Sequence, residues 1–162
     1  MITKEQYLDS LVRELEIIKH LGEKVKPEQM SFKPTEKQRT LGELMQYLGY
    51  VFPAVIEGAV KNDKAVYMQY HDSSVMPTPE TFAGIIDSEI AKVRELVMPL
   101  TEEQMTVEVD MWVKQTVAMH LLSALKNAVA YKMQLFLYLK QSGMPELNTM
   151  NLWVGRDPEP TM

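Results

Sequence analysis

The chain has 162 residues, a length typical of one domain with a hydrophobic core, and 46% of its residues are hydrophobic. Its 17 lysines and arginines and its 22 aspartates and glutamates give a net charge of -5. This balance argues against nucleic-acid binding, because contacts to phosphates need a basic surface. The absence of cysteine excludes disulfides, thiolate metal sites and a cysteine nucleophile. Because the sequence has neither a signal-peptide pattern nor a long apolar run, we expect one cytoplasmic domain over residues 1–162 without membrane contact.

The first predicted helix begins at a capping box of Thr3 and Gln6 and ends before Pro27, because the residue before a proline avoids helical geometry. Its apolar residues recur at spacings of three and four, as one buried helix face requires. They are Leu8, Leu11, Leu15 and Ile18.

A second helix is predicted from the capping box of Thr40 and Glu43 through an apolar stripe that continues past Pro53. A proline inside a helix removes a hydrogen bond and clashes with the preceding turn, so we expect a bend, eased by Gly49. The bend either curves the helix around the core or shapes a pocket beside Tyr47.

A polar connection is expected from Lys61 to Pro77, and it contains Tyr67, Tyr70 and His71. Long connections in compact domains are often functional. The alternative is a packed crossover that these aromatic side chains anchor to the core.

The third helix is predicted to begin at Thr78 and Pro79, a cap followed by proline at the first helical position, and to end at Pro99. Thr101 and Gln104 are a further capping pair, for a short turn. Residues 106–113 alternate between apolar and polar, which is typical of an extended segment. Because no second strand is evident, we interpret this segment as an extended connection without a sheet.

The fourth and longest helix is predicted from Thr116 to Ser142, with Gly143 as its C-terminal cap. The tail from Glu146 to Met162 is interpreted as a strap on the bundle that ends in disordered residues. Three tail residues are expected to pack on the bundle: Leu152, Trp153 and Val154. Four amphipathic helices with long connections predict an all-α four-helix bundle.

The three histidines lie on different segments, and none of them has a partner at the spacing of a helical metal-binding pair. We interpret His20, His71 and His120 as core or boundary residues. The alternative is a three-histidine site formed in space.

Two motifs give the chain a family resemblance. The stretches SFKPTEKQRTLGELMQYL (31–48) and LKNAVAYKMQLFLYLKQSGMP (125–145) resemble the second-helix and last-helix patterns of the DinB/YfiT-like superfamily of bacterial four-helix bundles. Members of that family commonly bind one nickel or zinc ion through three histidines. The resemblance places Tyr47, Asn127 and Tyr131 at these ligand positions. It also matches Gln134 to the family motif and makes His120 a further neighbour of the cavity.

The three residues at the ligand positions are poor ligands for nickel and zinc. Neutral imidazole is the preferred ligand of these metals, whereas tyrosine binds only as a phenolate, with an ordinary pKa of about 10. Asparagine offers only a carbonyl oxygen. We therefore expect no cofactor, with Ni or Zn as the alternative, and a hydrogen-bonded polar cluster of Tyr47, Asn127 and Tyr131 in the cavity.

Three functions follow from the resemblance. The first is a DinB-like protein that has lost the metal site and whose cavity binds a small molecule. The second is a metal-dependent transferase or hydrolase that acts on a low-molecular-weight thiol or a similar substrate. The third is an interaction protein that forms a homodimer, with the aromatic residues of the 61–77 connection at the interface.

Overall fold

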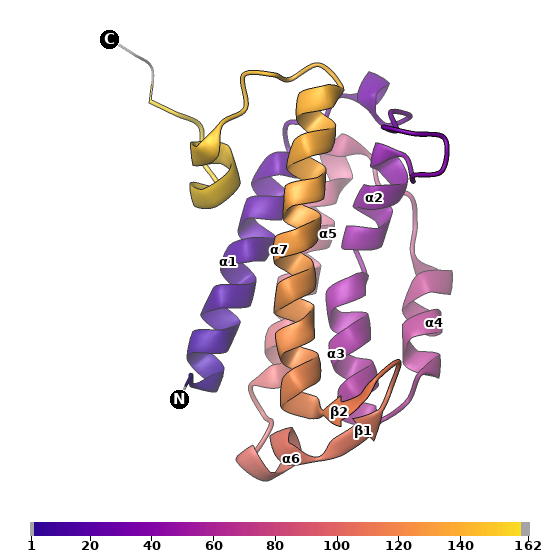
Figure 1. The fold of residues 1–162 in the computed structure, drawn as a ribbon, viewed down its shortest axis with the longest axis vertical. Coiled ribbons are helices and arrows are strands. Elements are labelled where there is room, and N and C mark those ends of the chain that lie inside the picture. The colour runs from indigo at the N-terminus through magenta and orange to yellow at the C-terminus, as the bar shows by residue number, and fades with distance from the viewer. Residues whose placement is uncertain (1, 160–162) are drawn as a thin grey trace.

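The computed structural model describes residues 2–159, and its long helices form the predicted bundle (Figure 1). Helix α1 spans Lys4–Gly22, α3 spans Val51–Lys61, α5 spans Pro79–Val97 and α7 spans Val117–Gln141. Helix α1 packs against α5 and α7, and α3 packs against the same two helices. The all-α four-helix fold is therefore confirmed.

The predicted caps are present at the starts of these helices. The Thr3 hydroxyl accepts the Gln6 backbone N–H at 3.2 Å, and the Gln6 side chain accepts the Thr3 N–H at 3.0 Å. At the same end of the bundle, Thr116 caps α7 through the Met119 N–H (Figure 1). Gly143 follows α7 with a φ of 119°, a conformation that favours glycine.

The second predicted helix is two helices, so the expected bend inside one helix is wrong. Helix α2 spans Leu41–Leu48, and the chain breaks at Gly49 and Tyr50 before α3 begins. Pro53 lies in the first turn of α3, where a backbone N–H has no helical partner to lose. The clash of proline with the preceding turn is thus resolved by a break four residues earlier.

The predicted connection from Lys61 to Pro77 contains a helix, α4, which spans Ala65–Ser73. Its start is stabilised by the Asp63 carboxylate, which accepts the Ala65 N–H at 2.9 Å. Only Val66 of this helix is buried. An apolar stripe, the main sequence signal of a helix, is therefore missing here.

A short hairpin closes the end of the bundle at which α7 begins (Figure 1). Strand β1, Glu108–Asp110, pairs antiparallel with β2, Lys114–Thr116, and Val109 faces Gln115. The expected connection without a sheet is therefore wrong, although the extended conformation is confirmed. Three-residue strands carry too little periodicity to be detected in the sequence. The short helix α6, Glu102–Thr106, has the predicted capping box.

The C-terminal tail returns alongside α1 and carries a helical turn at Met150–Val154 (Figure 1). Leu152 is buried, as expected, whereas Trp153 and Val154 remain about half exposed. The disorder expected at the end of the chain concerns residues 160–162, which lie outside the described residues. A 3-10 turn at Pro27–Gln29 follows α1, and the buried Gln29 amide donates to the Ser142 carbonyl at 3.1 Å.

No helix in residues 2–159 is long and apolar enough to cross a membrane.

Candidate functional site

Tyr47 and Tyr131, two of the three residues at the expected ligand positions, lie side by side. Tyr47 comes from the last turn of α2 and Tyr131 from the middle of α7. Their ring centroids are 4.9 Å apart, with 60° between the ring planes. The Arg39 guanidinium carbon lies 4.3 Å from the centroid of the Tyr47 ring and 6.0 Å from that of Tyr131. This is a cation–π arrangement, which stabilises a cation that is partly removed from water.

The protonation of Tyr47 disfavours a metal ligand at this position. Burial raises the pKa of Tyr47 above its ordinary value of 10, and the neighbouring Tyr131 raises it further. A phenol of this kind stays protonated at neutral pH, whereas a metal requires the phenolate. Within residues 2–159, no three His, Asp or Glu side chains lie where they could share a metal ion. The residues present therefore do not fit the family's metal.

The third expected position is Asn127, for which no contact with the tyrosine pair is found among the described residues. It lies one turn before Tyr131 on α7, is half-buried, and does not line the cavity beside Tyr47. The structure thus brings together two members of the expected cluster.

The two further residues named by the resemblance also lie elsewhere. His120 is buried in the first turn of α7, where its Nδ1 is 3.2 Å from the Gln115 amide nitrogen. Burial lowers the pKa of His120, so the ring is neutral at pH 7. The Gln134 amide donates to the Tyr138 hydroxyl at 3.1 Å, and that hydroxyl donates to the Arg39 carbonyl at 3.3 Å. Neither His120 nor Gln134 lines the cavity beside Tyr47.

The cavity beside Tyr47 has a volume of about 450 Å³ and lies between α2 and α4. Its lining combines aromatic rings with polar and charged groups. The lining residues are Arg39, Glu43, Gln46, Tyr47, Tyr50, Tyr67, His71 and Ser74.

A series of aromatic rings in contact runs from α7 past this cavity to the hairpin. Tyr131 contacts Tyr47, which contacts Tyr50 at 5.5 Å between centroids. Tyr50 contacts Tyr67 of α4 at 5.9 Å, and Tyr67 contacts Trp112 of the hairpin at 5.0 Å. These last contacts are edge-on, a preferred geometry of aromatic pairs. Three members of the series, Tyr47, Tyr50 and Tyr67, line the cavity, and Tyr131 and Trp112 extend the series to α7 and to the hairpin.

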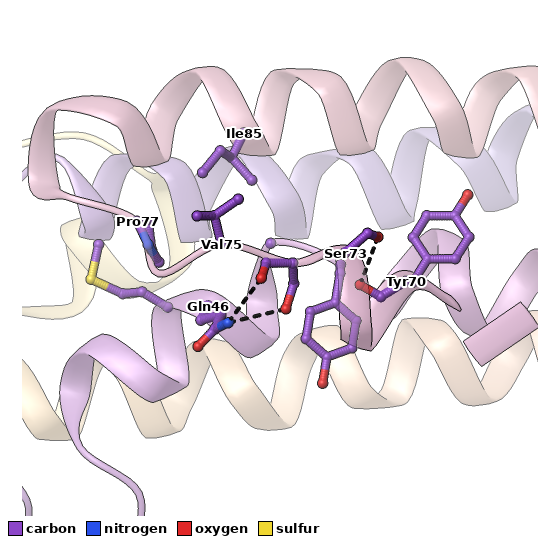
Figure 2. Close-up of a pocket in the computed structure, with 10 residues that line it drawn as sticks. Gln46, Tyr70, Ser73, Val75, Pro77 and Ile85 are labelled. Carbon is purple, nitrogen blue, oxygen red and sulfur yellow. Dashed lines mark hydrogen bonds between the residues drawn. The ribbon is translucent and has the colours of Figure 1, made fainter. Parts of the chain in front are cut away.

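A second, smaller hollow of about 210 Å³ adjoins the first and shares Gln46, Tyr50 and Ser74 with it. The Gln46 amide donates to the Ser74 carbonyl at 3.3 Å and to its hydroxyl at 3.1 Å, and so ties α2 to the end of α4. Figure 2 shows Pro77, Val75 and Ile85 at one end of this hollow, and Ser73 and Tyr70 at the other.

Sequence reasoning identifies only part of this site. Tyr67 and His71 belong to the predicted 61–77 connection, whereas no motif points to a site role for Arg39, Tyr50 or Trp112. The sequence shows no signal for α4, the helix that carries Tyr67 and His71 to the cavity.

Sequence reasoning also does not identify two buried charged features outside the cavity. Lys132 of α7 is 1% exposed, and its Nζ lies 2.6 Å from the Glu14 carboxylate of α1. The contact is an ion pair without the geometry of a hydrogen bond. Glu89 is buried in α5, and one of its oxygens has no hydrogen-bond partner among the described residues. Its position within the apolar stripe of Phe82, Ile86 and Val93 could have identified it.

Comparison with known proteins defines the fold class. No family model matches the sequence, and no curated protein matches it. Among solved structures, the chain is similar to a DinB-like protein of Bacillus subtilis, with 21% identity and a TM-score of 0.72 over 85% of this chain and 92% of that one. A DinB-like protein of Bacillus cereus is 16% identical, with a TM-score of 0.69 over 86% and 92% of the two chains.

A third similar structure, from Exiguobacterium sibiricum, is provisionally assigned to the DinB family. It is 19% identical, with a TM-score of 0.62 over 98% of this chain and 97% of that one. These likenesses show that the chain has the DinB-like four-helix-bundle fold, as the two sequence motifs predicted. Identities this low establish a fold and no activity.

Proposed function

We propose that this DinB-like bundle has lost the three-histidine metal site and uses the cavity beside Tyr47 to bind a small molecule. The observation that carries the proposal is the contact between the Tyr47 and Tyr131 rings at two expected ligand positions, with an aromatic-walled cavity beside them. A concave site with apolar walls and a few convergent polar groups is the usual form of a small-molecule site.

The test of metal loss is the metal content of tag-free protein after incubation with excess nickel or zinc and dialysis, measured by mass spectrometry. The wild type should retain no metal. A matched variant that combines Tyr47→His with Tyr131→His provides the control, because it places imidazole, the ligand type that both metals prefer, at the two positions that lie side by side. One metal per chain retained by the wild type would refute the loss of the site.

The test of ligand binding is a screen of small aromatic and aliphatic compounds by protein NMR. Compounds that bind should shift the amide signals of α2 and α4. The variant Tyr67→Ala, which removes one wall of the cavity, should weaken their binding. Binding confined to other surfaces of the bundle would exclude the cavity as the functional site.

One observation favours an enzyme as a second candidate. His71 lines the cavity, and its Nδ1 lies 2.9 Å from the Asp72 carboxylate. A histidine beside a carboxylate is a common general base, and it would act here without the family's metal. Compounds that bind should be incubated with the wild type and with His71→Gln and followed by mass spectrometry. Compounds that remain unchanged with the wild type would remove this candidate.

The proposal retains the homodimer, the cytoplasmic location, the single domain and the absence of nucleic-acid binding as predictions. The aromatic residues considered for the dimer interface face their own chain. Tyr67 contacts Tyr50, and the Tyr70 hydroxyl donates to Glu57. One apolar surface that a second copy could cover lies along α7, where four side chains are exposed: Met119, Leu122, Val129 and Leu137.

A further inference from the structure

We propose that the cavity beside Tyr47 recognises an aromatic carboxylate, whose acid group binds the Arg39 guanidinium and whose ring lies against Tyr50 and Tyr67. The inference rests on the proposed small-molecule function and adds to it the chemical class of the ligand.

The position of Arg39 leaves its hydrogen-bond donors available. Arg39 is half-buried in the lining of the cavity, with its guanidinium carbon 4.3 Å from the centroid of the Tyr47 ring. A guanidinium that stacks on a ring keeps the N–H groups along its edge free, in the fork geometry that matches a carboxylate. No Asp or Glu within residues 2–159 forms an ion pair with Arg39. A partly buried cation of this kind is more stable with an anionic partner.

The carboxylate and the imidazole that line the cavity already have partners. The Glu43 carboxylate accepts the Thr40 backbone N–H at 2.6 Å as part of the cap of α2, and this bond holds the pKa of Glu43 below its ordinary value. His71 is paired with the carboxylate of Asp72. Arg39 is therefore the one charged group of the lining that lacks a partner among the described residues.

The tyrosine hydroxyls of the lining add no negative charge. Burial raises the pKa of both Tyr47 and Tyr50 above the ordinary value, and a neighbouring tyrosine raises each further, so both hydroxyls stay protonated at neutral pH. The Gln46 amide nitrogen is already used by Ser74. The Arg39 guanidinium therefore remains the group of the lining that favours an anion.

The walls of the cavity indicate an aromatic ligand. Tyr50 and Tyr67 line it together with Tyr47, and flat rings bind best against other flat rings. An aromatic cage of this kind can also bind an organic cation. Here the Arg39 guanidinium already covers the Tyr47 ring, and its positive charge opposes a second cation. The adjoining hollow, with Met45, Val75 and Ile85, offers an apolar space for a ring substituent.

Three probes of similar shape test the class of ligand by isothermal titration calorimetry: a naphthalene carboxylate, the corresponding naphthyl alcohol, and a naphthyl trimethylammonium ion. The carboxylate should bind the wild type at least roughly tenfold more tightly than the alcohol, and its affinity should fall as salt is added. Cyclohexanecarboxylate, which keeps the acid but lacks an aromatic ring, should bind more weakly than the naphthalene carboxylate.

Variants of Arg39 then locate the acid group. Arg39→Gln should lower the affinity for the carboxylate by roughly tenfold and leave that for the alcohol unchanged. Arg39→Lys should retain part of the difference, because it keeps the charge but loses the fork of donors. Arg94→Gln, an exposed change on α5, is the matched control and should have no effect.

The outcomes separate the two proposals. Equal affinity for carboxylate and alcohol, or tighter binding of the ammonium ion, would overturn the ligand class while the cavity remains a binding site. Failure of every probe and of the wider NMR screen would overturn the small-molecule function itself. The comparison of probes on the wild type tests the ligand class even if an Arg39 variant unfolds.

Discussion

Glu89 lies in the middle of the apolar stripe of α5, between Ile86 and Val93, where a carboxyl group is costly. It is 6% exposed, and burial raises the pKa of Glu89 from 4.5 to about 8. At neutral pH the folded protein therefore holds this carboxyl in its neutral form, whereas the unfolded chain ionises it.

The pH dependence of stability should show this difference. Because the pKa of Glu89 is raised in the folded state, the folded protein binds the extra proton between pH 4.5 and about 8. The free energy of unfolding should therefore fall as pH rises through this window, by up to roughly 1.4 kcal/mol per pH unit relative to Glu89→Gln. Urea unfolding of both proteins at several pH values measures it. A difference that does not change with pH would show that Glu89 is ionised in the folded protein.

The ion pair of Lys132 and Glu14 is a second residue-scale feature with a measurable cost. Glu14→Gln would leave the charge of Lys132 buried without a partner, and we expect it to destabilise the protein by roughly 3 kcal/mol. The double variant Glu14→Leu with Lys132→Met removes both charges and should recover most of this loss. Glu16→Gln, on the exposed face of the same helix, is the control in urea unfolding. If the single and double variants lose the same stability, the charge on Lys132 is not the cause.

At the scale of elements, local sequence signals predicted the helix starts well and the interruptions poorly. The capping boxes at Thr3, Thr40 and Thr101 involve residues three apart, so the sequence contains the whole interaction. The break at Gly49 depends on α5, which is distant in the sequence. Helix α4 and the hairpin are stabilised by contacts such as that of Tyr67 with Trp112, which no local pattern reveals.

The break between α2 and α3 requires a glycine, because Ile85 of α5 packs closely against position 49. A Cβ atom at Gly49 would lie 2.8 Å from Cγ2 of Ile85, closer than real contacts allow. We expect Gly49→Ala to destabilise the protein by about 1–3 kcal/mol. Gly84→Ala is the matched control, because a Cβ atom there meets nothing within 4 Å and alanine should stabilise helix α5 by about 0.5–1 kcal/mol.

The double variant Gly49→Ala with Ile85→Ala separates the clash from other effects. Removal of the Ile85 side chain relieves the contact, so the Gly49 change should cost less in this background than in the wild type. Thermal and urea unfolding of the four proteins give the coupling. Purely additive losses would show that the cost of Gly49→Ala does not arise from the contact with Ile85, since the φ of -80° at Gly49 is open to any residue.

At the scale of the whole molecule, the fold could be predicted and the site could not. Apolar stripes in four helices specify a bundle, and the two motifs specified its type. The resemblance also led to Tyr47 and Tyr131, because their positions follow from the register of two helices. The site is completed by residues from three different connections: Arg39, Tyr50 and Trp112. Their contacts depend on how these connections pack, which cannot be predicted from a single sequence.

The last prediction concerns assembly. Four apolar side chains on the outer side of α7 are between 38% and 45% exposed: Met119, Leu122, Val129 and Leu137. Removal of such a surface from water on pairing with a second copy is favourable. We expect size-exclusion chromatography with light scattering to give twice the chain mass of 18.6 kDa.

The double variant Leu122→Glu with Val129→Glu should be a monomer, because pairing would bury its charges. Met68→Glu, an exposed change on α4, should leave the dimer intact. A monomeric wild type would rule out the dimer, and a dimer that persists in the double variant would place the interface elsewhere.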